Sequence, residues 1–165
     1  MSSAQTLDHR LLLLARTRAH GPLRERLVAG FSLTGEHAAW WLALGVTGAV
    51  VAGPGQQRSR WLRGVRAVAA SYVVNTMLKL AVGRPRPVLD GLPPLTPTVS
   101  TLSFPSAHAT TSFTAARAYR GLLPAWGLYT LAVAYGLSRP YLGVHYPSDV
   151  LAGALLGTAV GQGGT

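Results

Sequence analysis

Apolar residues in this chain gather into long runs that short basic, glycine-rich or proline-rich segments separate. The runs cover residues 38–53, 65–82, 106–123, 124–138 and 147–161. Several are shorter than the ~20 residues that an untilted membrane helix needs, yet each is long enough for three or more helical turns. The pattern therefore predicts an all-α fold, an integral membrane helical bundle with about five transmembrane helices.

A different pattern precedes the first run. Between residues 7 and 31, leucines and a phenylalanine alternate with five arginines, and Gly21-Pro22 interrupts the segment. This pattern is typical of two short amphipathic helices that lie at the level of the lipid headgroups. We therefore divide the chain into an interfacial segment, residues 1–36, and a transmembrane core, residues 37–165.

The connecting segments add detail to this core. Residues 54–64 are rich in glycine, glutamine and arginine and predict a polar turn outside the hydrocarbon. Residues 88–104 contain several prolines, threonines and serines and predict a long loop over one membrane face. In the last run Gly153, Gly157 and Gly161 recur every fourth residue, which predicts a ridge for close helix packing.

Composition supports a membrane protein. Of 165 residues, 48% are hydrophobic and only 12% are charged, whereas soluble domains carry roughly 25% charged residues. The net charge of +10 does not indicate a nucleic-acid partner, because the arginines stand between apolar runs instead of forming a tract with aromatic residues. The lipid bilayer and its anionic headgroups are the expected partners. The chain has no cysteine, which excludes disulfides and thiolate metal sites.

Polar residues suited to phosphate chemistry form three clusters, residues 79–87, 105–108 and 138–149. Each cluster lies where a predicted helix begins or ends, and alternating helix directions place all of these ends at the same membrane face. The spacing thus predicts one pocket that contains four cations, two histidines and one carboxylate. Its expected members are Lys79, Arg84, Arg86, Ser106, His108, Arg139, His145 and Asp149.

Such a pocket suits a phosphate ester, because guanidinium groups bind phosphate oxygens in pairs and lysine adds a point charge. Asp149 lies four residues after His145, so its carboxylate can orient one imidazole nitrogen and leave the other free to attack phosphorus. His108 would protonate the leaving group. Either histidine taken singly is more often structural than catalytic. Arg84 is either a second phosphate contact or a charge at the lipid surface.

The same residues resemble a known family. Lys79-x6-Arg86-Pro87, Pro105-Ser106-Ala107-His108 and Ser138-Arg139-x5-His145-x3-Asp149 are similar, in this order, to the three-part signature of the type 2 phosphatidic acid phosphatase superfamily. The resemblance covers residues 79–161, and alanine at position 107 departs from the more usual glycine.

This resemblance implies a phosphatase that needs no metal and no other cofactor. It implies phosphate binding by Lys79, Arg86, Ser106 and Arg139. It also implies that His145 is the nucleophile, that Asp149 supports it and that His108 is the general acid and base. Many members have six spans, whereas this sequence predicts five.

These features predict a lipid phosphatase in the plasma membrane of a bacterium. The favoured substrate is an isoprenoid-linked phosphate, such as decaprenylphosphoryl-5-phosphoribose or undecaprenyl diphosphate, cleaved through a phosphohistidine. The alternatives are a phosphatidylglycerophosphate or phosphatidic acid phosphatase, a phosphotransferase, and a lipid-phosphate binder or transporter without hydrolysis. Arginines at the opposite face favour a pocket on the outer side. The sequence predicts no oligomeric state.

Overall fold

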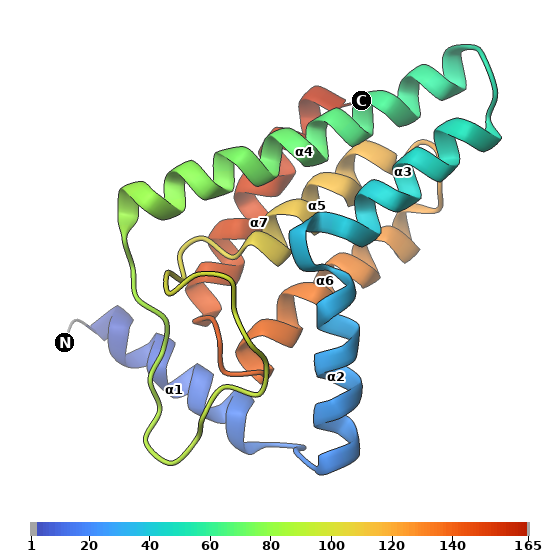
Figure 1. The fold of residues 1–165 in the computed structure, drawn as a ribbon. Helices are drawn as coiled ribbons and strands as arrows, with labels where there is room; N and C mark the ends of the chain where they lie inside the picture. Colours follow the sequence, from blue (N-terminus) through green and yellow to red (C-terminus); the bar gives the residue numbers. More distant parts are fainter. Residues whose placement is uncertain (1–2, 165) are drawn as a thin grey trace.

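The computed structural model describes residues 3–164, and these residues form an all-helical structure (Figure 1). Two helices precede the core and five compose it, with short 3-10 helices η1 before α3 and η2 after α7. Their bounds are α1 Ser3–Thr17, α2 Pro22–Thr34, η1 Glu36–Ala38, α3 Ala39–Val51, α4 Gln56–Val82, α5 Ala107–Tyr119, α6 Ala125–Tyr141, α7 Pro147–Gly161 and η2 Gln162–Gly164.

Helix α5 lies at the centre of the core, and α3, α4, α6 and α7 pack around it (Figure 1). Its sequence consists mainly of alanine, threonine and serine, small residues that let neighbouring backbones come close. Trp41 of α3 donates a hydrogen bond from Nε1 to Ser112 Oγ of α5 at 2.8 Å. Tyr119, near the end of α5, donates to the carbonyl of Trp41 at 3.2 Å. Buried polar groups therefore find partners between helices, as a bundle in lipid requires.

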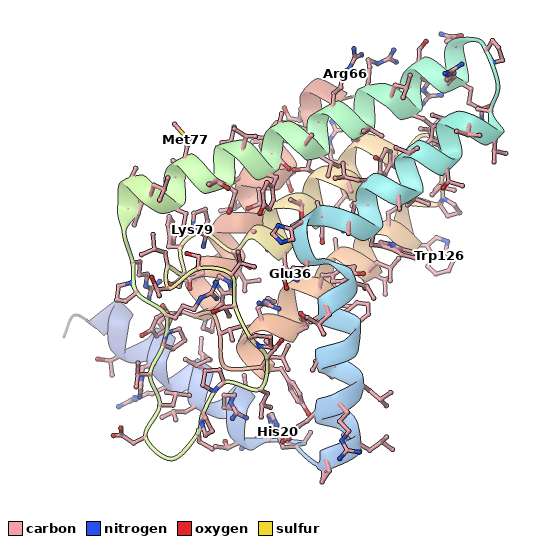
Figure 2. All side chains as sticks on the ribbon, viewed as in Figure 1. His20, Glu36, Arg66, Met77, Lys79 and Trp126 are labelled. Carbon is pink, nitrogen blue, oxygen red and sulfur yellow. The ribbon has the colours of Figure 1, made fainter. Side chains whose placement is uncertain are left out.

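The outer surface of the core is apolar. Val73, Met77 and Leu80 on the outer side of α4 are each at least 60% exposed, and Figure 2 shows Met77 directed away from the bundle. Leu151 and Leu155 of α7 are exposed in the same way. Among the described residues one helix, α4, is long and apolar enough by itself to count as a candidate membrane span. The number of five spans therefore stays a prediction.

The glycine ridge of α7 packs as the sequence predicts. A Cβ atom added to Gly157 would lie 2.1 Å from the carbonyl oxygen of Thr110, and one added to Gly153 would lie 2.6 Å from that of Ser106. Thr114 Oγ1 donates a hydrogen bond across this contact to Gly157 O at 3.0 Å. The missing side chains thus set the distance between α5 and α7, which carry the predicted histidine His108 and carboxylate Asp149.

Most predicted helices are confirmed, including both amphipathic ones and the last helix from Pro147. Three boundaries are wrong. The expected polar turn 54–64 is mostly helical, because α4 begins at Gln56 and its glutamines and arginines are good helix formers. Helix α5 ends at Tyr119, before Leu123, and α6 continues through Pro140 in its last turn.

We predict that Gly157→Ala destabilises the protein by about 1–3 kcal/mol, because the new methyl group must push α5 away from α7. Unfolding of the purified protein by heat or by denaturing detergent measures the effect. Gly127→Ala in α6 is the matched control, since no atom lies within 4 Å of the added Cβ. Equal stability of the two variants would contradict the role of the ridge.

Candidate active site

A cavity of about 240 Å³ lies where the helix ends predicted from the sequence meet. Five of the eight predicted site residues line it, and each comes from a different segment. Lys79 belongs to the last turn of α4, His108 to the first turn of α5, and Arg139 to the last turn of α6. Arg86 and His145 come from the loops after α4 and after α6. The predicted convergence at one face is therefore what the fold produces.

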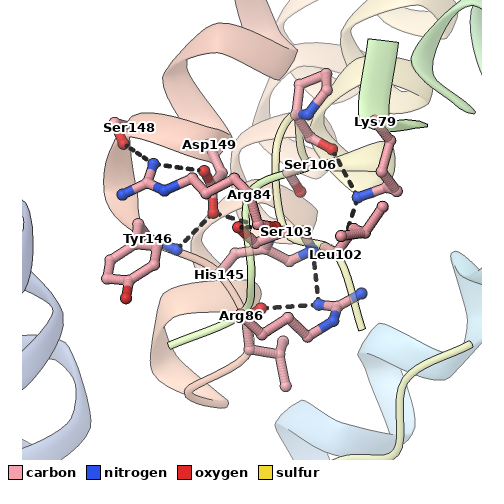
Figure 3. Close-up of polar contacts among 12 residues, drawn as sticks. Lys79, Arg84, Arg86, Leu102, Ser103, Ser106, His145, Tyr146, Ser148 and Asp149 are labelled. Atoms are coloured by element: carbon pink, nitrogen blue, oxygen red, sulfur yellow. Dashed lines mark hydrogen bonds and ion pairs between the residues drawn. The ribbon is translucent and has the colours of Figure 1, made fainter. Parts of the chain in front are cut away.

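His145 presents its Nε2 atom to this cluster of cations (Figure 3). Nε2 lies 3.1 Å from Nη1 of Arg86, and a guanidinium group only donates, so Nε2 must be an unprotonated acceptor. The ring proton is then on Nδ1, which lies 3.5 Å from Oδ2 of Asp149. Burial, followed by three neighbouring cations, lowers the pKa of His145 well below its ordinary value of 6.5. The ring is therefore neutral, with the lone pair of Nε2 directed at the cations of the cavity.

Asp149 is fixed before any substrate arrives. It is fully buried, and its Oδ2 atom accepts a hydrogen bond from the backbone N–H of Tyr146 at 2.9 Å, as part of the capping box of α7. Its other oxygen, Oδ1, accepts from Arg84 Nη1 at 2.7 Å. A carboxylate held from both sides has little freedom to turn away from His145, so its position 3.5 Å from Nδ1 is built into the start of the helix. Nδ1 itself has no hydrogen-bond partner among the described residues.

Arg84 lies outside the cavity lining. Its guanidinium bridges two carboxylates, Asp149 and Asp8 of α1, each at 2.7 Å. It also rests 4.0 Å from the centre of the Tyr146 ring, and Figure 3 shows it beside Asp149 and Tyr146. Burial lowers the pKa of Arg84, but the hydrogen bond to Asp8 and the two negative charges raise it above its ordinary value. The structure therefore places this predicted phosphate ligand behind the nucleophile, where both of its nitrogen arms are already occupied.

The three cations at the cavity are held mainly by neutral acceptors. Lys79 donates to the carbonyls of Leu102 and Pro105 at 3.1 and 3.2 Å. Arg86 donates to the carbonyls of Ser100 and Val144, both at 2.7 Å. These bonds fix the side chains without neutralising their charge. One ammonium proton of Lys79 and the Nη2 group of Arg86 have no acceptor among residues 3–164, which leaves them available for an anion.

His108 and Arg139 share a partner that sequence reasoning missed. Nε2 of His108 lies 2.9 Å from the backbone carbonyl of Ser32, which can only accept, so Nε2 carries a proton. Nη1 of Arg139 donates to the hydroxyl of the same serine. Ser32 belongs to α2 and is fully buried. A single serine among the apolar residues of an amphipathic helix gives no signal of this role in the sequence.

Ser106 is also placed at the site, but beneath the cavity lining. It is the N-cap residue of α5 and is fully buried, and its hydroxyl has no partner among the described residues. Its backbone N–H donates to the carbonyl of Asp149 at 3.0 Å, which joins the starts of α5 and α7.

Among residues 3–164 no group of three or more histidine or acidic side chains is arranged to hold a metal ion.

Comparison with known proteins agrees with this arrangement. The model of the PAP2 superfamily matches residues 61–164, which is more than half of the chain and includes all eight predicted site residues. The chain belongs to the PAP2 superfamily. The family predicted from the three-part signature is thereby confirmed, and so is the prediction of a phosphatase, because relatives in this family are named phosphatases.

Three relatives show the range of this PAP2 family. The chain is 40% identical over 133 residues to the decaprenylphosphoryl-5-phosphoribose phosphatase of Mycobacterium tuberculosis. The aligned region covers 80% of this chain and 73% of that protein. It is 33% identical over 95 residues to an undecaprenyl-diphosphatase of Bacillus subtilis, covering 56% and 49%. The crystal structure of a transmembrane PAP2 type phosphatidylglycerolphosphate phosphatase from Bacillus subtilis superposes with a TM-score of 0.79 at 25% identity, covering 98% and 84%.

We predict that His145 of this PAP2 enzyme stays neutral, with its proton on Nδ1, from pH 8 to pH 6. The reason is that burial and the adjacent cations keep its pKa well below 6.5, so protonation begins only at lower pH. Nitrogen NMR of protein labelled with 15N-histidine measures this, and a His145→Ala sample identifies the signal by difference. A signal that titrates near pH 6.5, or that shows the proton on Nε2, would contradict the assignment.

We also predict that Ser32→Ala lowers kcat/KM about tenfold. The substitution removes the hydroxyl acceptor of Arg139 but keeps the backbone carbonyl that His108 contacts, and a hydrogen bond to a charged group contributes about 1.5–3 kcal/mol. Phosphate release under steady-state conditions measures it. Leu33→Ala, at the next residue of α2 with a side chain that is 48% exposed, is the control and should keep full activity. A Ser32→Ala variant as active as the wild type would refute the positioning role.

Proposed function

We propose that the protein is a metal-independent phosphatase that removes a terminal phosphate from a membrane lipid through a phosphohistidine on His145. One observation supports this proposal most directly. The unprotonated Nε2 atom of His145 faces a cavity lined by three cations, while Nδ1–H faces a buried carboxylate. A site that only bound phosphate would need the cations but not an oriented, neutral imidazole among them.

The reaction has two steps. In the first, the Nε2 lone pair of His145 attacks phosphorus, the bond between phosphorus and the leaving oxygen breaks, and His108 donates a proton to that oxygen. In the second, His108 accepts a proton from water, the water oxygen attacks phosphorus, and the bond to Nε2 breaks to release inorganic phosphate. Lys79, Arg86 and Arg139 neutralise charge on the phosphoryl oxygens in both transition states.

The proton route through His108 follows from its contact with Ser32. Because Nε2–H already donates to the Ser32 carbonyl, an added proton goes onto Nδ1 of His108. The Ser32 carbonyl thus fixes which nitrogen of His108 exchanges the proton. Asp149 plays the corresponding part for His145, where its negative charge stabilises the positive imidazole that forms when Nε2 bonds to phosphorus.

We place the lipid tail of the substrate outside the bundle and its phosphate in the cavity. Leu80 and Val99, both at the edge of the cavity, are 66% and 71% exposed, so an apolar chain can leave the cavity there and enter the bilayer. The relatives act on isoprenoid-linked phosphates, on lipid A and on phosphatidylglycerolphosphate according to their names. Because a decaprenylphosphoryl-5-phosphoribose phosphatase is 40% identical, we favour an isoprenoid-linked substrate.

In this proposal α3 to α7 cross the plasma membrane of a bacterium, and residues 1–36 lie at its surface. The end of the bundle opposite the cavity carries the arginines at the start of α4 and at the end of α5. Arg60 and Gly121 connect these two segments through a hydrogen bond of 3.2 Å. Because short cytoplasmic segments are enriched in arginine and lysine, we place the cavity at the outer face.

The proposal predicts that purified protein in detergent releases phosphate from polyprenyl phosphates in the presence of EDTA, and that His145→Ala has no measurable turnover. A stable fold of this variant, measured by unfolding, serves as the control. Loss of activity in EDTA that magnesium restores would overturn the metal-independent mechanism. An active His145→Ala variant would overturn the assignment of the nucleophile.

A substrate whose leaving group needs no proton isolates the second step. With p-nitrophenyl phosphate, His108→Ala should still form the phosphohistidine but hydrolyse it slowly, so that acid-labile phosphoenzyme accumulates. An added alcohol then separates the alternatives, because a phosphotransferase forms the alcohol's phosphate ester in preference to inorganic phosphate. Binding of lipid phosphate with neither product nor phosphoenzyme would instead identify a binder or transporter.

A further inference from the structure

The proposed mechanism leaves part of the cavity wall without a role. Besides the cations and histidines, the lining includes Asn75 of α4 and Glu36 of η1, together with His37 and Tyr72. Both Asn75 and Glu36 carry a side-chain oxygen that can accept a hydrogen bond. Neither acceptor can bind a phosphate oxygen, because phosphate at neutral pH presents acceptors almost exclusively.

The side-chain amide of Asn75 is fixed by its neighbours. Its Nδ2 group donates to the carbonyl of Pro105 at 3.3 Å and to Thr110 Oγ1 at 2.9 Å. The Thr110 hydroxyl already donates to Ser106 O, and a carbonyl cannot donate, so the amide cannot be turned around. Oδ1 is therefore the atom left without a partner, in a residue that is 1% exposed. An unpaired buried acceptor costs roughly 1–3 kcal/mol, which a ligand that donates a hydrogen bond would recover.

Glu36 is the second unused acceptor. Its carboxylate accepts no hydrogen bond among residues 3–164, although it lies near enough to Arg86 and Arg139 to interact with their charges. Figure 2 shows it at the bend between α2 and α3. A negative group in the lining weakens phosphate binding by repulsion, so its presence points to a different part of the ligand.

The backbone at this bend is held in an unfavourable conformation. His37 and Ala38 have positive φ angles of 52° and 61°, which cost about 1–3 kcal/mol each for residues other than glycine. His37 Nδ1 lies 2.8 Å from the hydroxyl of Tyr72, which ties the bend to α4. Gly35 next to it leaves room for His108 and Tyr135, since an added Cβ would lie within 3.0 Å of both. The segment that presents Glu36 is thus closely fitted to the site.

We infer that this wall binds hydroxyl groups of the leaving alcohol, so that the substrate carries its terminal phosphate on a sugar or a similar polyhydroxyl headgroup. This inference rests on the proposed function and adds the part of the substrate that Glu36 and Asn75 recognise. A hydroxyl donates one hydrogen bond to each acceptor, and the lipid chain then leaves past Leu80 and Val99. A phosphate attached directly to a polyprenyl chain offers no donor and leaves both acceptors unpaired.

The test compares two lipids of the same chain length, a polyprenylphosphoryl pentose phosphate and a polyprenyl phosphate, in the same detergent. The wild type should show the higher kcat/KM for the pentose phosphate. Glu36→Met keeps the length of the side chain but removes the acceptor and the charge. It should lower kcat/KM for the pentose phosphate about tenfold to a hundredfold, and leave the polyprenyl phosphate unchanged or improved because a repulsive charge is gone.

Two further variants sharpen the result. Asp90→Asn removes a negative charge from the exposed loop on the same face and should affect both lipids equally. Glu36→Gln keeps an acceptor oxygen and should give a smaller loss for the pentose phosphate, so the comparison survives if Glu36→Met does not fold. Activity of either Glu36 variant on polyprenyl phosphate demonstrates a folded enzyme.

The outcomes separate this inference from the function on which it rests. Release of phosphate from both lipids, with no preference in the wild type or with equal losses in the Glu36 variants, would overturn the inference and leave the phosphatase intact. Release from neither lipid would overturn both. A loss confined to the pentose phosphate would establish Glu36 as a residue that determines specificity.

Discussion

Three positive charges that face one another are the constraint around which this structure is organised. Lys79, Arg86 and Arg139 converge on one small cavity. Glu36 and Asp149 are near enough to interact with these charges, but among the described residues neither forms a salt bridge with the three cations. Their repulsion is opposed mainly by neutral groups, the carbonyls of the Leu102 to Pro105 segment and of Ser100 and Val144, and the Ser32 hydroxyl. The helix dipoles also oppose this repulsion, because Lys79 and Arg139 lie in the last turns of α4 and α6, where the helix dipole is negative. A phosphate group carries negative charge that would balance these cations, so the arrangement suits an anion at the expense of stability.

The supports of the nucleophile extend to the surface of the protein. Asp8 of α1 accepts hydrogen bonds from Arg84 and from the backbone N–H of Ser148, and Arg84 in turn binds the carboxylate that faces His145. Burial raises the pKa of Asp8, but the bonds from Ser148 and Arg84 lower it below its ordinary value of 3.8. The contribution of this contact to stability is therefore complete above about pH 4 and is lost only as the pH falls further. Helix α1, which lies beside the bundle in Figure 1, is thus connected through Arg84 to the carboxylate that faces His145.

Much of this arrangement could be predicted from the sequence, because it depends on local signals. Pro147 marks the start of α7, the repeated glycines predict its packing face, and the order of the charged clusters predicts that helix ends of alternating direction meet. Helix boundaries were less predictable where the polarity of the residues and their helix propensity favour different structures. Arginines and glutamines that are too polar for hydrocarbon are still good helix formers, so α4 extends beyond the predicted span to Gln56. Arg84 shows most clearly what the sequence could not predict. No residue near it in the sequence indicates that Asp8, 76 positions earlier, would form a salt bridge with its guanidinium.

The part of the site that no motif predicts comes from the segment before the matched family region. Residues 61–164 match the family model and contain His145, Asp149 and the three cations that line the cavity. Asp8, Ser32 and Glu36 precede that region. Asp8 contacts Arg84, and Ser32 contacts both His108 and Arg139. Glu36 lines the cavity. In this chain Lys79, His108 and Arg139 lie at helix ends whose geometry is fixed by backbone packing. The amphipathic segment packs against those ends from outside, where side chains can change without disturbing the α5 to α7 contact. Differences in headgroup preference among relatives can therefore arise in this segment while the reaction itself stays the same.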